Sequence, residues 1–338
     1  IMLEPKDKQS QKYPGIVIEF KVINPRKENQ NKIRRMLHDY EVIMCCDPEL
    51  FKFSFDTVFS MEELRRANII IGTPNVIALS NCENLEWLQT ISSVADPLTK
   101  SGLLDSRTTL VTTARGVFDD TLSDFMVGAI YNYRRNFYIF RDLQQKKIWS
   151  YESPAKPVNK IAGSNVLVVG LGHIGSAFAK KMYALGANIY GIRQNITQKP
   201  TYVKEIYSLE RLNDILEQMD YVALCLPDMP RPVLAKEQFK LMKSTALIIN
   251  TARGGLINTD DLAEALHNKE IGGAVLDATI PDPLPNNHPL WQEENCILTF
   301  HNASGYGIED MRQMTEEIIL TNVRNYLNGD DLLNLVKY

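Results

Sequence analysis

Apolar and polar positions along the chain form short buried runs that alternate with longer amphipathic segments. An alternation of this kind predicts parallel sheets with helices packed on their faces, so we expect an α/β protein. The apolar runs that predict strands are residues 16–20, 41–44, 68–72, 87–91, 110–113, 166–169, 188–192, 203–207, 221–226, 246–250, 273–276 and 296–300.

Helical periodicity predicts helices at 27–38, 209–218, 259–267 and 308–328, and a long helix from 121 to about 149. This long helix is apolar around nearly its whole circumference and must therefore be covered on several sides. Ordinary burial within one monomer would satisfy that need. We favour burial between domains and across a homodimer.

The run VLVVGLGHIG at 166–175 joins a buried strand to three glycines, Gly170, Gly172 and Gly175. Glycines at this spacing allow a tight turn, close approach to a pyrophosphate, and packing of a following helix on the strand. A helix at 176–185 would direct its free N–H groups at that phosphate. Because a second strand follows at 188–192, the context predicts a dinucleotide site.

The end of that second strand bears on which dinucleotide binds. An NAD site usually has an acid there for the ribose hydroxyl, whereas an arginine accommodates a 2′-phosphate. Here Arg193 follows the strand, and no acid occurs before Glu205. A solvated surface arginine in an NAD enzyme is the alternative, but the pattern favours NADP(H) over NAD(H).

Composition excludes several classes of partner. The 338 residues carry a formal charge of -4, which leaves no broad basic field for nucleic acid or an acidic membrane. No apolar run reaches membrane-spanning length. The five cysteines include the adjacent Cys45 and Cys46, which do not suggest a disulfide framework, so we expect a cytoplasmic protein. We identify no metal-ligand pattern.

Reactive side chains follow the ends of several predicted strands. Pro227, Arg253, Asp277 and His301 all do so, and ligands of open α/β sheets bind beyond these carboxyl ends. Ketone reduction needs an acid, a cation for the oxygens and a group that keeps the acid charged. His301, Arg253 and Asp282 are candidates for these tasks, although each alone has an ordinary structural explanation.

Together these segments resemble a known family. The runs IINTARGGLINTDDLAEAL at 248–266, GGAVLDATIPDPLPNNHPLW at 272–291 and ILTFHNASGY at 297–306 follow the glycine motif in order. They are similar to the D-isomer-specific 2-hydroxyacid dehydrogenases, and the segment around Arg115 is similar to glyoxylate/hydroxypyruvate reductases. This family has a Rossmann-like doubly wound coenzyme domain and a flavodoxin-like substrate domain. The resemblance therefore implies domains at 114–302 and at 1–113 with 303–338.

The resemblance also implies roles for individual residues. Arg253 would bind the substrate carboxylate, His301 would donate the proton, and Asp282 would hold the other ring nitrogen of His301. Asp277 matches the acid near the nicotinamide carboxamide. Pro227 and Thr251 match positions that line the cofactor, and His173 and Ile174 would offer backbone N–H groups to the pyrophosphate. Ser93 and Val94 lie in the loop that would hold the substrate carboxylate.

Three positions depart from the family pattern. Asp282 stands where glutamate is usual, so the pair with His301 must be closer or bridged by water. Phe300 replaces a common proline, which changes the backbone more than the chemistry. Val94 replaces glycine, which narrows the pocket or shifts the loop.

The expected reaction is reduction of a small 2-keto acid, such as glyoxylate or hydroxypyruvate, to the D-2-hydroxy acid. Two alternatives stay open: a 3-phosphoglycerate dehydrogenase, and a dinucleotide-sensing binding protein with little turnover. The first is less favoured because we see no clear phosphate-reading cluster or appended regulatory domain.

Overall fold

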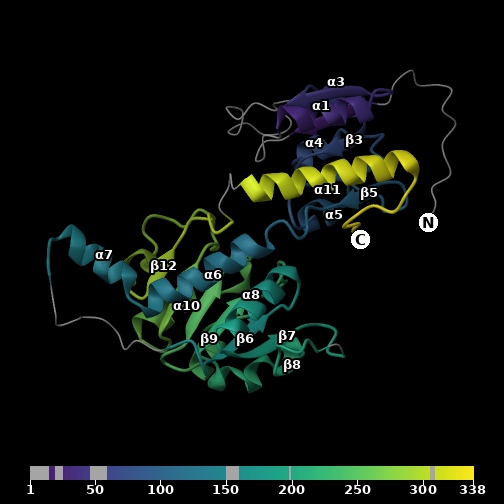
Figure 1. The fold of residues 1–338 in the computed structure, drawn as a ribbon. Helices are drawn as coiled ribbons and strands as arrows, with labels where there is room; N and C mark the ends of the chain where they lie inside the picture. Colours follow the sequence, from purple (N-terminus) through teal and green to yellow (C-terminus); the bar gives the residue numbers. More distant parts are fainter. Residues whose placement is uncertain (1–14, 20–25, 46–58, 150–159, 198, 305–308) are drawn as a thin grey trace. The chain divides into compact units, whose positions relative to one another are not determined.

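A computed structural model describes residues 15–19, 26–45, 59–149, 160–197, 199–304 and 309–338 (Figure 1). The chain divides into two compact units. We call residues 118–305 the continuous unit, and residues 1–117 with 306–338 the split unit, because two separate stretches of chain build it.

The continuous unit is built on a seven-stranded sheet in which every neighbouring pair is parallel. The strand order is β12-β11-β10-β9-β6-β7-β8. The chain begins at β6 in the middle, adds β7 and β8 on one side, and then crosses to the other side, where β9 to β12 follow in order. This is the doubly wound, Rossmann-like topology expected from the sequence. The strands are β6 (Asn165–Val169), β7 (Asn188–Ile192), β8 (Glu205–Tyr207), β9 (Tyr221–Leu224), β10 (Leu247–Asn250), β11 (Gly273–Leu276) and β12 (Cys296–Leu298).

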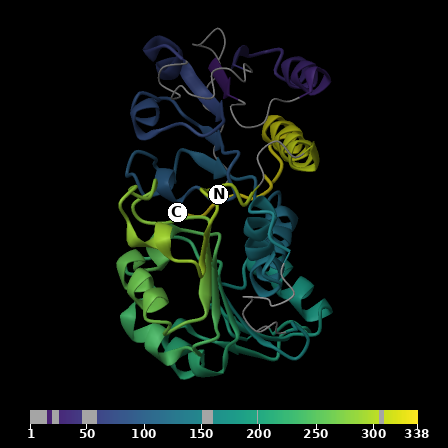
Figure 2. The same cartoon turned by 90° about the vertical axis from the view of Figure 1, so that its left-hand side faces the viewer.

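Helices cover both faces of this sheet, which Figure 2 shows edge-on. Val166 and Val168 join the core under α6 and α8, whereas Leu167 and Val169 join the opposite core. Alternate side chains of β6 thus enter different cores. Because both cores are apolar, β6 is apolar at every central position. The helices are α6 (Asp119–Arg134), α7 (Phe137–Gln145), α8 (His173–Ala184), α9 (Lys236–Leu241) and α10 (Thr259–His267), with 3-10 turns η2 (Leu209–Asp214), η3 (Leu216–Gln218), η4 (Gly254–Leu256) and η5 (Pro289–Gln292).

The split unit has a five-stranded parallel sheet in the order β2-β1-β3-β4-β5. This is the flavodoxin-like order that the family resemblance implies. Its strands are β1 (Gly15–Glu19), β2 (Glu41–Cys45), β3 (Ala67–Ile71), β4 (Trp87–Gln89) and β5 (Leu110–Thr112). Its helices are α1 (Lys27–Met36), α3 (Met61–Arg66), α4 (Val76–Ser80), α5 (Asp96–Thr99) and α11 (Glu309–Asn328).

Helix α11 is fastened to the split unit by buried polar contacts. Asn322 donates to the Gln89 side chain at 2.7 Å, and Gln89 also accepts from Thr112 at 2.8 Å. Glu316, only 2% exposed, accepts from the backbone N–H of Arg26, the N-cap residue of α1. These contacts hold the C-terminal helix on strands from the first third of the chain.

Three expectations about helices were wrong. The single helix predicted at 121–149 is two helices, because Asn136 adopts a left-handed conformation (φ 58°) between α6 and α7. Moreover, α7 buries none of its residues in this chain. The helix predicted at 209–218 is instead two 3-10 helices, and the helix after the glycines begins at His173 rather than Ser176. Within the described ranges, no helix is long and apolar enough to cross a membrane.

Candidate active site

The glycine turn, residues 170–175, links β6 to α8 and leaves no room for side chains at two of its glycines. Gly170 has φ 106°, and a Cβ there would overlap the Cys225 carbonyl. A Cβ on Gly175 would overlap the Gly170 carbonyl oxygen and hold α8 away from the strand. The first and third glycines therefore set the path of the backbone.

The middle glycine meets open space instead. No atom lies within 4 Å of a Cβ built on Gly172, which caps the N-terminus of α8. The first N–H groups of a helix have no partner within it, and here His173 and Ile174 supply two of them. This open cradle beside helix donors fits a pyrophosphate, as the sequence predicts.

The His173 side chain contacts an acid from a neighbouring helix. Its Nδ1 lies 3.4 Å from Asp119 Oδ2 in the first turn of α6. Burial raises the pKa of the Asp119 carboxyl above its usual range, and the nearby histidine opposes part of that rise. The contact fixes the start of α6 against the start of α8, two helices that pack along their length (Figure 1).

Arg193 follows β7 directly, as expected. Its backbone N–H donates to the Tyr207 carbonyl on β8, so the residue is held at the carboxyl edge of the sheet. Its side chain is partly exposed there. Gly191 in the same strand leaves space for the Leu171 side chain of the glycine turn, which a Cβ would overlap.

His301 and Asp282 are in direct contact. His301 Nδ1 lies 3.0 Å from Asp282 Oδ2, within hydrogen-bonding distance, and both side chains are about half exposed. The shorter acid therefore reaches the ring without a bridging water. Such a pair can hold one ring nitrogen and leave the other to exchange a proton with a ligand.

The histidine turn, residues 299–303, has an unusual backbone. Phe300 and His301 have φ values of 56° and 59°, a left-handed conformation that non-glycine residues rarely adopt. A proline, which is fixed near φ −65°, cannot take this conformation. Phe300 thus has a backbone conformation that proline could not adopt, and the centroid of its ring lies 5.8 Å from that of Trp291, on which it stacks.

Arg253 lies in the arginine turn, residues 250–254, which follows β10. The buried Asn250 side chain closes this turn by donating to the Arg253 carbonyl (2.9 Å) and accepting from the Ala252 N–H (3.1 Å). Arg253 is extended and partly exposed, and its Nη1 donates to the Ala252 carbonyl.

Gly254 brings the arginine turn against the loop that carries Asp282. A Cβ on Gly254 would overlap the Thr279 carbonyl, so the two backbones are in direct contact. The structure thus joins the Arg253 and Asp282 loops by packing, and Asp282 to His301 by a hydrogen-bond contact.

The other predicted site residues vary in exposure. Asp277 is buried at the end of β11, whereas Pro227 after β9 is exposed and Thr251 is partly exposed. Ser93 and Val94 follow β4 in the split unit, and the Val94 N–H donates to the Ser92 hydroxyl at 3.3 Å. That amide, expected to meet a substrate carboxylate, therefore has an internal partner.

Two cysteines, Cys225 and Cys296, pack against the cores of the sheet. Burial raises the pKa of the Cys225 and Cys296 thiols to about 12. Both are therefore neutral thiols near pH 7, which is the unreactive form.

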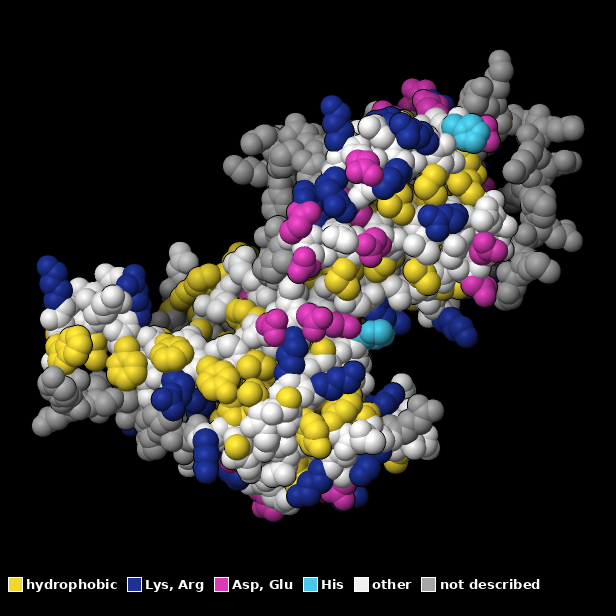
Figure 3. All heavy atoms as spheres, in the orientation of Figure 1, with side chains coloured by type: hydrophobic (Ala, Val, Ile, Leu, Met, Phe, Trp, Pro, Cys, Tyr) yellow, Lys and Arg dark blue, Asp and Glu magenta, His cyan; other side chains and the backbone are white. Residues whose placement is uncertain are grey.

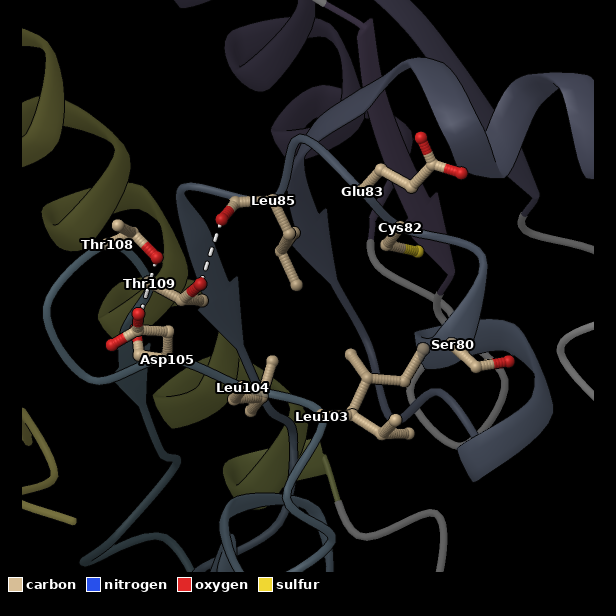
Figure 4. Close-up of a pocket in the computed structure, with 10 residues that line it drawn as sticks. Ser80, Cys82, Glu83, Leu85, Leu103, Leu104, Asp105, Thr108 and Thr109 are labelled. Carbon is tan, nitrogen blue, oxygen red and sulfur yellow. Dashed lines mark hydrogen bonds between the residues drawn. The ribbon is translucent and has the colours of Figure 1, made fainter.

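A separate hollow of about 240 Å³ lies in the split unit (Figure 4). Leu85, shortly before β4, and Thr109, directly before β5, line it. The Thr109 hydroxyl donates to the Leu85 carbonyl at 2.9 Å. It lies at the amino ends of these strands, opposite the ends where α/β ligands bind. Ser93 and Val94 do not line it.

Sequence reasoning missed the residues that shape the two reactive turns. The sequence predicts Asn250 only as the end of a strand, and Gly254 only as part of the family motif at 248–266. A buried asparagine at the last position of an apolar strand is a usable signal, since a buried amide requires partners. No sequence pattern indicates the contact made by Thr299 or the left-handed backbone at Phe300.

Comparison with known proteins gives a family match for the part of the chain that carries these turns. Residues 127–303, about half of the chain, match the model of the D-isomer specific 2-hydroxyacid dehydrogenase NAD binding domain. A glyoxylate reductase of Thermofilum pendens is 31% identical over 307 residues, which is 85% of this chain and 87% of that protein.

Two further comparisons bear on activity and fold. A D-3-phosphoglycerate dehydrogenase of Methanocaldococcus jannaschii is 32% identical over 179 residues, 52% of this chain and 34% of that protein. The structure of a D-isomer specific 2-hydroxyacid dehydrogenase from Xanthobacter autotrophicus Py2, in complex with NADPH and MES, superposes with a TM-score of 0.77 at 22% identity. It covers 96% of this chain and 98% of that one.

The family match, the glyoxylate reductase similarity and the fold agree with each other. A nicotinamide dinucleotide is the cofactor that this fold and family use. The chain belongs to the D-isomer specific 2-hydroxyacid dehydrogenase family, oxidoreductases that act on the CH–OH group of their donors.

Proposed function

We propose that this enzyme uses NADPH to reduce a small 2-keto acid, such as glyoxylate or hydroxypyruvate, to the D-2-hydroxy acid. The observation that carries the proposal is the 3.0 Å contact between His301 Nδ1 and Asp282 Oδ2. His301 follows β12 and Asp282 follows β11, at the same sheet edge as the glycine turn after β6. The Thermofilum pendens relative is a glyoxylate reductase.

In the proposed mechanism each side chain has one task. His301 donates the proton to the developing alkoxide, while Asp282 keeps the ring oriented and stabilises its charged form. Arg253 binds the substrate carboxylate and polarises the keto oxygen. A nicotinamide dinucleotide, when bound, would supply the hydride.

Arg193 supports NADPH as the preferred form of the cofactor. A guanidinium at the end of β7 can bind a 2′-phosphate through two hydrogen bonds, and an acid there would repel it. Pro227, Thr251 and Asp277 complete the proposed cofactor contacts.

We also propose a cytoplasmic homodimer that forms through the continuous unit. Apolar side chains gather over α6 and α7 (Figure 3), where Tyr131, Phe137 and Phe140 are more than a third exposed. An exposed apolar surface of this kind suits a second copy of the chain.

Oxidation of NADPH, followed at 340 nm with glyoxylate, hydroxypyruvate, 3-phosphohydroxypyruvate and bulkier 2-keto acids, tests the proposal. We expect turnover with the first two, and a decrease of about 10³-fold in His301→Ala. His267→Ala is the matched control, because His267 is an exposed histidine that also contacts an acid, Glu293. Tight NADPH binding without turnover on any keto acid would support a sensor protein instead.

The preference between cofactors has its own test. We expect Arg193→Ala to raise the KM for NADPH about tenfold or more while leaving that for NADH unchanged, since it removes a charged hydrogen bond. Arg211→Ala, at an exposed arginine of the same unit, is the control. A strong NADH preference in the native enzyme that survives Arg193→Ala contradicts the NADPH assignment.

A phosphorylated substrate is the second candidate. The similarity to a D-3-phosphoglycerate dehydrogenase favours it. A kcat/KM for 3-phosphohydroxypyruvate at least tenfold above that for hydroxypyruvate would select it.

A further inference from the structure

The carboxylate of Asp277 accepts hydrogen bonds from three residues of the histidine turn. Its Oδ1 accepts hydrogen bonds from the Thr299 hydroxyl (2.7 Å), the Asn302 N–H (2.8 Å) and the Ala303 N–H (3.0 Å). The Asp277 carbonyl accepts a fourth bond from the His301 N–H at 2.7 Å. One residue at the end of β11 thus contacts the turn on both sides of His301.

The turn needs such support. Phe300 and His301 are consecutive left-handed residues, a conformation that costs free energy in any chain without glycine. Backbone of this kind persists only where surrounding contacts determine it. Residues 299, 302 and 303 flank the strained pair, and all three donate to the same oxygen.

Asp277 is itself held rigidly. It is 6% exposed, and its N–H donates to the Asn250 carbonyl at the end of β10. Asn250 closes the arginine turn with its side chain. The ends of two adjacent strands therefore fix the turns that carry Arg253 and His301 relative to each other.

We propose that Asp277 is a positioning residue, which holds the histidine turn so that the His301 ring meets Asp282. Its consequence for turnover rests on the proposed function. This role differs from the cofactor contact considered above, because Oδ1 already accepts three hydrogen bonds from the histidine turn. Among the described residues none donates to Oδ2.

Three variants separate the two roles. Asp277→Ala removes the acceptor, and Asp277→Asn keeps an oxygen at the same place. Thr299→Val removes one donor from the turn and leaves the carboxylate intact. Thr315→Val is the control, because the Thr315 hydroxyl donates to the Met311 carbonyl within α11 of the split unit.

The first measurement uses the free protein and needs no substrate. Amide hydrogen exchange at Asn302 and Ala303 reports the turn, and the ¹⁵N shift of His301 Nδ1 reports the Asp282 contact. We expect exchange at both amides to accelerate at least tenfold in Asp277→Ala, with a changed His301 shift. Asp277→Asn should restore most of the protection, and Thr299→Val should show a smaller change.

The second measurement is steady-state kinetics. A turn displaced by about 1 Å should decrease kcat about a hundredfold in Asp277→Ala. In Thr299→Val, kcat should decrease while the KM for NADPH stays constant. A cofactor role alone would instead raise the KM for NADPH in Asp277→Ala and leave Thr299→Val like the native enzyme.

The outcomes are distinguishable from failure of the proposed function. Unchanged exchange and an unchanged His301 shift in both Asp277→Ala and Thr299→Val would overturn the positioning role, whatever the activity. Lost protection in a protein that turns over no keto acid would keep the positioning role and reject the reductase. If Asp277→Ala does not fold, Thr299→Val decides alone.

Discussion

The glycine turn and the histidine turn lie at the same edge of one sheet, but different forces shape them. The glycine turn is defined by side chains that are absent, since a Cβ at Gly170 or Gly175 would overlap backbone. The histidine turn is defined by a buried carboxylate that compensates for a strained backbone. At Gly170 and Gly175 any side chain would overlap backbone, so no substitution fits. The histidine turn depends on several hydrogen bonds, and removing one of them weakens the turn only in part.

The steric turn should give the largest loss of stability. In Gly175→Ala the new methyl group meets the Gly170 carbonyl oxygen, so α8 must move from β6. We expect the free energy of unfolding to decrease by about 3 kcal/mol in urea denaturation.

Gly172→Ala is the matched control for that loss, because its Cβ meets open space. It should cost at most about 1 kcal/mol of stability, the cost of alanine at a helix N-cap. It should nevertheless weaken NADPH binding in fluorescence titrations, because the methyl group enters the cradle. Equal destabilisation by the two alanines would show that packing does not define this turn.

The His301–Asp282 pair should give the next largest effect, on catalysis. Asp282→Asn keeps the shape of the side chain but cannot stabilise a charged ring. We expect kcat to decrease about a hundredfold, equivalent to about 2.7 kcal/mol in the activation free energy. Stability should change by less than about 0.5 kcal/mol, because the pair is half exposed. Glu293→Gln, which alters the His267 pair, should leave kcat unchanged; a native rate in Asp282→Asn would remove the acid from the mechanism.

The arginine turn resembles the histidine turn in depending on one buried polar side chain. Asn250→Ala leaves the Ala252 N–H and the Arg253 carbonyl without that partner. We expect about 2 kcal/mol of destabilisation and an increased KM for the keto acid. Asn258→Ala, which removes the N-cap of α10, should cost about 1 kcal/mol without changing that KM. An unchanged KM for the keto acid in Asn250→Ala would mean that the arginine turn does not take part in substrate binding.

The smallest effect concerns the thiol beside the glycine turn. Because burial raises the pKa of Cys225 to about 12, the folded protein keeps a proton that the unfolded chain releases above about pH 8.5. Its contribution to stability is therefore complete below that pH and decreases as the pH rises. We expect about 1 kcal/mol less stability at pH 9 than at pH 7 from this group.

Comparing the pH dependence of unfolding in Cys225→Ala with that of the native protein isolates this contribution. The variant should lose less stability than the native protein between pH 7 and pH 9, whatever its stability at pH 7. Identical pH profiles would mean that the thiol ionises as readily in the folded state as in the unfolded chain.

The contrast between the two turns also explains what the sequence predicts. Adjacent residues define the glycine turn, so Gly170, Gly172 and Gly175 were identified from spacing alone. The Asp282 contact followed from a family resemblance. The support from Asp277 was not predictable, because it depends on the register between β11 and β12 and on a backbone conformation at Phe300 that no residue pattern indicates.

The same distinction holds for the helices. Periodicity located α1, α10 and α11 closely. It missed the break at Asn136, because one left-handed residue does not interrupt the apolar pattern around it.

The attachment of α11 has a consequence for synthesis on the ribosome. The strands β1–β5 are made before α11, yet Gln89 and Arg26 receive their partners Asn322 and Glu316 only when α11 is made. The continuous unit emerges in between as one uninterrupted stretch and can fold as a domain during translation. The nascent split unit meanwhile stays incomplete for about two hundred codons, an interval in which chaperones have most to protect.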